Sequence, residues 1–132
     1  MSEAHIAYAN MGPWPVYVGF TKSRKAFGRE MKRLAIKGVP FLAPDHANAS
    51  THFLEHGGAL TCIITLGSTK DRSIEQIASL IAHEAVHVAQ EVWSSVGETK
   101  PGREAEAYLV QHVTQHCLQI ALDTGRTKKE AP

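Results

Sequence analysis

The residues with the clearest chemistry are His83, Glu84 and His87, which form the pattern His-Glu-x-x-His. Residues four apart lie one above the other on the same face of an α-helix, so both imidazoles can point at one position. Neutral imidazoles are good zinc ligands, and Zn–N bonds of about 2.0–2.1 Å tolerate little error in their spacing. The carboxylate of Glu84 would lie beside the metal, where it can take a proton from water. The pattern therefore predicts a hydrolytic zinc site.

The segment around this motif has the spacing of an amphipathic helix, which we expect from Asp71 or Ser73 to about Trp93 or Ser95. Apolar residues recur there at intervals of three and four, as on a helix with one buried face: Ile74, Ile77, Ala78, Ile81, Ala85, Val88, Ala89 and Val92. Ser73 and Gln76 have the spacing of a capping box. The apolar residues alone explain why this face is buried, so packing gives no reason for two histidines and a glutamate beside it. Their presence therefore favours a metal site over a chance match.

A catalytic zinc usually has three protein ligands, so a third must come from elsewhere in the chain. A following helix, expected at about 103–123, carries Glu104 and Glu106 in its first turn. Glu104 shares a face with Tyr108, whereas Glu106 lies nearer the apolar line of that helix. Helical geometry leaves both carboxylates as candidates. The one that does not bind metal is an ordinary first-turn acid, favoured there by the helix dipole.

Together these segments resemble the gluzincin-type zinc metallopeptidases, in which His-Glu-x-x-His on one helix is completed by a glutamate on the next. The segment Glu104-Ala105-Glu106-Ala107-Tyr108 is similar to the Glu-x-x-Ala segment of that family, and the chain is also similar to short metallopeptidase-like proteins of bacteriophages and prophages. The resemblance covers about residues 73–118 and implies a zincin-like domain with Zn²⁺ on the two motif histidines and Glu104. It departs from the family at Tyr108, where some members have an aspartate.

These residues predict hydrolysis of peptide bonds. Zinc would lower the pKa of water towards about 7, and Glu84 would take its proton and pass it to the leaving amine. Tyr108 is a candidate for polarising the substrate carbonyl, with packing between the two helices as the other interpretation. We expect a peptide or protein substrate to bind in extended form along strand 59–66. The alternatives are a non-catalytic zinc protein that binds a partner, and a binding domain with a chance motif and no metal.

The remaining histidines have more ordinary interpretations. His112 and His116 are four apart but have no acidic neighbour, so exposed helix positions are preferred to a second metal site. His52 and His56 are candidate donors to a substrate oxyanion, although solvent-facing strand positions are favoured for both.

The tryptophans and cysteines are expected to be packing residues. Trp14 and Trp93 are interpreted as apolar bulk in the core or at an interface. Cys62 and Cys117 have apolar neighbours and are interpreted as small core residues in a reducing compartment, in preference to a disulfide or metal ligands.

Length and charge exclude several classes of protein. The 132 residues suffice for one domain with a single core, and the net charge of +1 gives no electrostatic indication of nucleic acid or an anionic membrane as partner. No segment approaches about 18 consecutive apolar residues, and the amino terminus lacks a signal-peptide pattern, so a cytoplasmic protein is expected. The oligomeric state stays open.

The order of elements predicts an α+β fold, with a small mixed β-sheet and helices packed on one face. A single domain over 1–132 is expected, with flexible ends at 1–12 and 126–132. Periodicity and turn residues predict strands at 16–20, 39–42, 51–55 and 59–66, the last two forming a hairpin, and helices at about 23–37, 73–95 and 103–123.

Overall fold

Four strands and three helices make up the described part of the chain, which is residues 5–44, 48–56 and 59–123 of a computed structural model. They are β1 (Tyr8–Asn10), β2 (Val16–Thr21), α1 (Arg24–Arg33), β3 (Ala49–His56), β4 (Ala59–Leu66), α2 (Ile74–Ser95) and α3 (Arg103–Ala121). The strands form one sheet in the order β1-β2-β4-β3. β2 and β4 pair in parallel at its centre, and β1 and β3 are antiparallel edges. In this part of the chain, no helix has the length and apolar character needed to cross a membrane.

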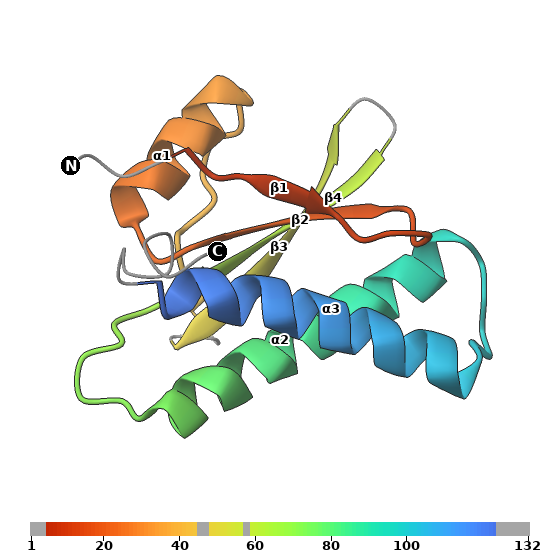
Figure 1. Ribbon diagram of the computed structural model, residues 1–132. Helices are drawn as coiled ribbons and strands as arrows, with labels where there is room; N and C mark the ends of the chain where they lie inside the picture. Colours follow the sequence, from red (N-terminus) through yellow and green to blue (C-terminus); the bar gives the residue numbers. More distant parts are fainter. Residues whose placement is uncertain (1–4, 45–47, 57–58, 124–132) are drawn as a thin grey trace, which may run out of the picture.

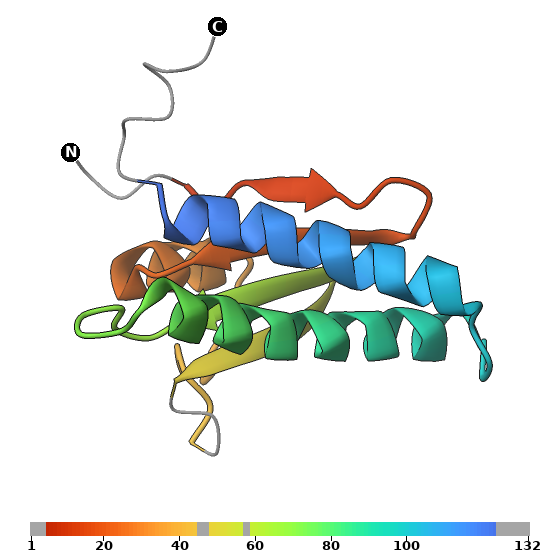
Figure 2. The same ribbon diagram turned by 60° about the horizontal axis from the view of Figure 1, so that its bottom comes forward.

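The sheet is the middle of three layers (Figure 1). α2 and α3 lie side by side across one face (Figure 2), where they pack on Val18 of β2 and on Cys62 and Ile64 of β4. α1 lies on the opposite face, where its Phe27 packs with Ile63 of β4. The predicted α+β class and mixed sheet are confirmed, but the helices are not all on one face. Because side chains alternate along β4, its apolar run supplies a core on each side.

The amino-terminal segment contains a strand that the sequence did not predict. Residues 1–12 were expected to be flexible, yet Tyr8–Asn10 pairs with β2 and Met11 is buried. A three-residue strand is too short to give a pattern of alternation. Gly19 makes the approach of this segment possible, because a Cβ at that position would lie 2.6 Å from Cγ2 of Ile6. Of the ends predicted to be flexible, residues 1–4 and 126–132 lie outside the described part.

Segment 39–42 was predicted as a strand but joins none of the four strands of the sheet. Pro40 has no N–H for a strand ladder, and Phe41 is buried against Phe27 at a ring distance of 5.7 Å. The apolar character that suggested a strand therefore reflects burial of a loop in the core beside α1.

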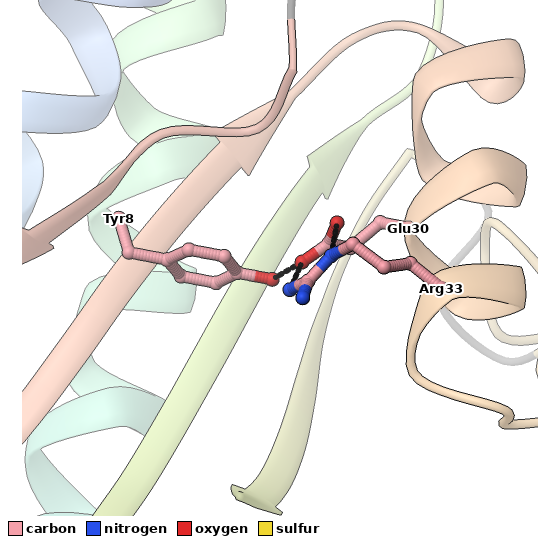
Figure 3. Close-up of polar contacts among 3 residues, drawn as sticks. All are labelled: Tyr8, Glu30 and Arg33. Atoms are coloured by element: carbon pink, nitrogen blue, oxygen red, sulfur yellow. Dashed lines mark hydrogen bonds and ion pairs between the residues drawn. The ribbon is translucent and has the colours of Figure 1, made fainter.

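On the α1 side of the sheet, the buried Glu30 of α1 binds both Tyr8 of β1 and Arg33 of its own helix (Figure 3). The Tyr8 hydroxyl donates to Oε2 of Glu30 at 2.5 Å, and Arg33 donates to both carboxylate oxygens at 2.9 and 2.7 Å. These bonds, led by those from Arg33, hold the pKa of Glu30 below its usual range, although burial opposes the shift. The carboxylate therefore stabilises the folded state by attaching the terminal strand to the helix.

We predict that Glu30→Gln lowers the free energy of unfolding at neutral pH by about 1–3 kcal/mol, because hydrogen bonds to a charged carboxylate are lost. The folded-state pKa of Glu30 is lowered, so its contribution is complete above the ordinary carboxyl pKa of 4.5 and is lost as the pH falls below that value. Urea unfolding of both proteins should therefore give curves that converge in acid. Glu55→Gln, at an exposed position of β3, is the matched control. An equal loss in the control, or a difference that does not depend on pH, would contradict this assignment.

Candidate metal centre

The motif lies within α2, an unbroken helix of 22 residues. Its start is fixed by the predicted capping box: the N–H of Gln76 donates to Oγ of Ser73 at 3.1 Å, and the N–H of Ser73 donates to Oε1 of Gln76 at 2.8 Å. The predicted apolar face is buried at Ile77, Ile81, Ala85, Val88, Ala89 and Val92. The prediction of an amphipathic helix that carries the motif is therefore confirmed.

His83 and His87 lie together on the outer side of α2. Their Nε2 atoms are 3.3 Å apart, and the ring planes cross at 78°. Two Zn–N bonds of about 2.0–2.1 Å at a tetrahedral angle would also separate two nitrogens by about 3.3 Å. His83 is exposed and His87 is half-buried, so both rings can be reached from solvent. The pair therefore has the donor atoms and the spacing for two positions of a zinc site.

Gln90 orients one of these rings. Nδ1 of His87 lies 3.0 Å from Oε1 of Gln90, and because that oxygen can only accept, Nδ1 carries the proton and donates. In the neutral ring, Nε2 then has a free lone pair directed towards His83. Without metal, this lone pair can accept a hydrogen bond from Nε2–H of His83, and the same tautomer is the one that binds a metal through Nε2. Gln90 was not predicted from the sequence, although its position three residues after His87 was a usable signal.

Glu84 points to the buried side of α2 and is 4% exposed. Its Oε1 accepts a hydrogen bond from Oγ1 of Thr51 on β3, at 2.5 Å. This bond attaches the motif helix to an edge strand of the sheet and holds the carboxylate on the buried side of α2, whereas the two histidines lie on its outer side. Thr51 could not be predicted, because its contact with Glu84 depends on how a strand 33 positions away packs under the helix.

The carboxylates predicted as third ligand lie elsewhere. Glu104 and Glu106 are both exposed in the first turn of α3. Within residues 5–44, 48–56 and 59–123, no three His, Cys, Asp or Glu side chains come together as a metal site would need, so neither glutamate is beside the histidine pair. Tyr108 is 50% exposed on the same helix and makes no hydrogen bond to the motif within these residues.

The packing of the helices explains this separation. α2 lies over β3 and β4, whereas α3 lies over β2 and along the other flank of α2 (Figure 2). Glu84, which follows the first histidine, points towards β3. The two histidines lie on the outer side of α2, and no carboxylate of α3 comes together with them in the described part of the chain.

Two histidines differ from their favoured interpretation. His52 does not face solvent: it is partly buried on the α1 side of the sheet, where Nε2 lies 3.1 Å from the carbonyl oxygen of Phe41 and its ring is 4.8 Å from that of Phe27. Burial lowers its pKa, and its side of the sheet is opposite to α2, so it cannot donate to a substrate at the motif. His116 is also partly buried, and burial lowers its pKa. His112 is exposed, and the centroid of its ring lies 5.7 Å from that of Trp14. The side chain of His56 lies outside the described part.

Both cysteines are core residues, as predicted. Cys62 and Cys117 are free and fully buried, and burial raises the pKa of Cys62 to about 12 and that of Cys117 further. Both are therefore thiols at neutral pH and are poor metal ligands. Trp14 and Trp93 are partly buried against the same core, as their interpretation as packing residues required.

We predict that zinc binds the wild-type protein, that His87→Ala abolishes this binding, and that Gln90→Ala weakens it by about 10–100-fold, the usual effect of losing the partner of a ligand histidine. Competition with a chromogenic chelator measures each affinity. Gln111→Ala, at an exposed position of α3, is the control for the loss of an amide. Equal affinities for Gln90→Ala and wild type would refute the orienting role of Gln90.

The same titration tests the third ligand. Because Glu104 and Glu106 are remote from the histidine pair, we expect Glu104→Gln and Glu106→Gln to bind zinc as tightly as the wild type. A loss of about tenfold or more in Glu104→Gln alone would support the ligand predicted from the sequence and would require the first turn of α3 to move towards the pair. The same loss in Glu106→Gln alone would select the other carboxylate.

Comparison with protein-family models, curated protein sequences and solved structures gave no match to this chain. The interpretation of the centre therefore depends on the residues and distances of this chain itself: the paired imidazoles, the amide that orients one of them, and the buried carboxylate of the residue that follows His83.

Proposed function

We propose that this protein is a zinc-dependent hydrolase of peptide bonds, with His83 and His87 as metal ligands and Glu84 as general base. The observation that carries the proposal is the 3.3 Å separation of the two Nε2 atoms, which matches two positions of a tetrahedral zinc. Glu84 follows the first ligand directly, as a proton acceptor beside the metal must. Glu104, the third ligand implied by the sequence resemblance, belongs to the proposal only if the titration above selects it.

Each side chain has a distinct task in this proposal. Gln90 holds the proton of His87 on Nδ1 and so leaves Nε2 free to bind. Thr51 donates to one oxygen of Glu84, which leaves the other oxygen to take a proton from water and deliver it to the leaving amine. Bound zinc would supply a Lewis acid that polarises the scissile carbonyl and makes water more acidic. Tyr108, which the sequence offered as a group to polarise the carbonyl, is assigned no step in this proposal, because it makes no hydrogen bond to the motif within the described residues.

The order of strands in the sheet moves the proposed substrate position from strand 59–66 to β3. Strand 59–66, which we expected to pair with an extended peptide, is β4, and it is flanked by β2 and β3 on its two sides. β3 is the edge strand beside the motif, and among the described strands it pairs only with β4. Phe53, two residues after Thr51 and on the same side of the strand, is 41% exposed and offers an apolar contact. We therefore propose that an extended peptide adds to β3.

A non-catalytic zinc protein is the second candidate function, and one observation favours it. Glu84 is almost completely buried and its carboxylate already has a partner in Thr51, as expected of a residue that only attaches a helix to a sheet. In that case zinc would stabilise the fold or a partner interface, and Glu84 would have no role in turnover.

We predict that Glu84→Gln keeps zinc and lowers the rate of peptide cleavage by about 10²–10⁴-fold, the range of a lost general base. Zinc-loaded proteins would be compared on a mixture of unstructured peptides, with cleavage followed by mass spectrometry. Glu75→Gln, at an exposed position in the first turn of α2, is the control and should cleave as the wild type does.

Full activity in Glu84→Gln would rule out the general-base role. Absence of cleavage by the zinc-loaded wild type, together with a rise in its melting temperature on zinc addition that His83→Ala lacks, would favour the non-catalytic candidate. The metal titration and the cleavage assay thus separate the two functions.

A further inference from the structure

A second candidate site lies at one end of the sheet, where the two parallel strands β2 and β4 end. Because β2 and β4 run in the same direction, their carboxyl ends meet at one end of the sheet, next to the start of α1 and the end of α3 (Figure 1). A cavity of about 780 Å³ opens there. It is lined by Thr21 from β2, by Gly67 and Ser68 after β4, and by Ile120 of α3. In sheets with parallel strands, ligands bind preferentially outside the carboxyl ends of the strands.

The charge of this cavity has one sign. Three cations line it, namely Lys22, Arg24 and Lys25, and none of its described lining residues is an Asp or Glu. These cations are densely placed on a chain whose net charge is only +1. A cavity with cationic walls and no carboxylate among its described lining residues favours an anionic ligand.

Two of these cations are held in place by neighbouring groups. Nζ of Lys22 donates to the carbonyl oxygen of Ala121 at 2.9 Å, which uses one of its three donors. The guanidinium of Arg24 lies over the ring of Phe41, with its central carbon 4.7 Å from the ring centroid. The N–H donors of this guanidinium make no hydrogen bond within the described residues and are therefore available to a ligand. Arg24 can therefore bind an oxyanion with two parallel bonds.

Backbone donors point to the same place. The hydroxyl of Ser23 accepts from the N–H of Ala26 at 3.0 Å, and the N–H of Ser23 donates to Oγ1 of Thr21. The N–H groups of Arg24 and Lys25 have no bond within the described residues, and they are the first two of α1. Free N–H groups and the dipole of a ten-residue helix add to the attraction of the side chains for an anion.

We propose that this cavity binds a small organic phosphate, with the phosphate group against Arg24, Lys25 and the start of α1. A phosphate group has the negative charge and the acceptor oxygens that match the forked guanidinium of Arg24, the ammonium of Lys25 and the free backbone N–H groups. The cavity is much larger than a bare phosphate, and its volume is within the range of about 300–1,000 Å³ found for small-molecule sites. Phe20, Phe41 and Ile120 supply apolar walls for the rest of the ligand.

This site is separate from the candidate metal centre. None of its described lining residues belongs to α2 or β3, which carry the histidine pair, Glu84 and Thr51. Its occupation is therefore independent of zinc, and the proposal does not rest on the hydrolase function.

The test is calorimetric titration of the full chain at constant ionic strength with three probes: a nucleoside 5′-monophosphate, the same nucleoside without phosphate, and inorganic phosphate. We expect the monophosphate to bind about tenfold or more tightly than the nucleoside, because only the former makes charge-assisted bonds. The double variant Arg24→Gln/Lys25→Gln should bind the monophosphate about tenfold or more weakly than the wild type, since two cations are removed. The control Lys32→Gln/Lys37→Gln changes the net charge equally and should bind as the wild type does. His83→Ala should also bind normally.

The outcomes are decisive because both residues changed in the test variant are exposed, so that the variant should fold as the wild type does. Circular dichroism checks this, and shifts of the Arg24 and Lys25 amide resonances on addition of the monophosphate locate the site independently. Equal weakening in both double variants would show attraction by overall charge and overturn the proposal. Binding of the nucleoside as tight as that of its monophosphate, or no binding of either phosphate probe, would also overturn it. Binding of inorganic phosphate alone, without the monophosphate, would reject the organic ligand.

Discussion

The parallel pairing of β2 with β4 is the constraint on which the rest of the structure depends. Parallel strands need cover on both faces, because the connection between them leaves the edge of the sheet and returns across a face. Ile63 and Ile64 of β4 are both fully buried, one towards each layer of helix. α1 must therefore lie on one face, while α2 and α3 cover the other. The antiparallel strands β1 and β3 are left as edges.

This arrangement places the two candidate sites on different parts of one scaffold. The metal centre depends on a flank of α2 and on the edge strand that passes under it, where Thr51 reaches Glu84. The cationic cavity depends on the common direction of the central strands, which gathers the residues after β2 and after β4 at one end. The two candidate sites share no described residue, so neither requires the other.

Local signals predicted the parts of the structure that depend on neighbours in sequence. The capping box at Ser73 and the spacing of His83 and His87 are properties of a single helix, and the structure has both. The contact between Gln90 and His87 is also a property of this one helix, so the spacing of the two residues could have predicted it. Strand 59–66 was identified by its composition, but its central position in the sheet was not, because sheet order depends on pairing between distant segments.

The features that were missed depend on packing over long distances. The bond from Thr51 to Glu84, the burial of His52 beside Phe27 and the separation of Glu104 from the histidine pair all follow from where whole elements dock. The resemblance to gluzincins supplied a second helix with a carboxylate, but it did not determine on which flank of the first helix that carboxylate lies. The sequence therefore located the histidine pair on its helix, but it did not predict which side chains of other elements lie near the pair.

Gly19 has a consequence for how this domain can diverge. Because Gly19 has no side chain, the side chains of Ile6 and Tyr8 can lie directly over β2 at this position. Even a methyl group on residue 19 would overlap with Ile6. The branched Ile6 side chain cannot swing aside as a long flexible chain would. Any descendant that acquires a larger residue at this position must move its first strand elsewhere, and with it the partner of Glu30. The absence of a side chain at residue 19 thus allows the amino-terminal strand to remain part of the sheet.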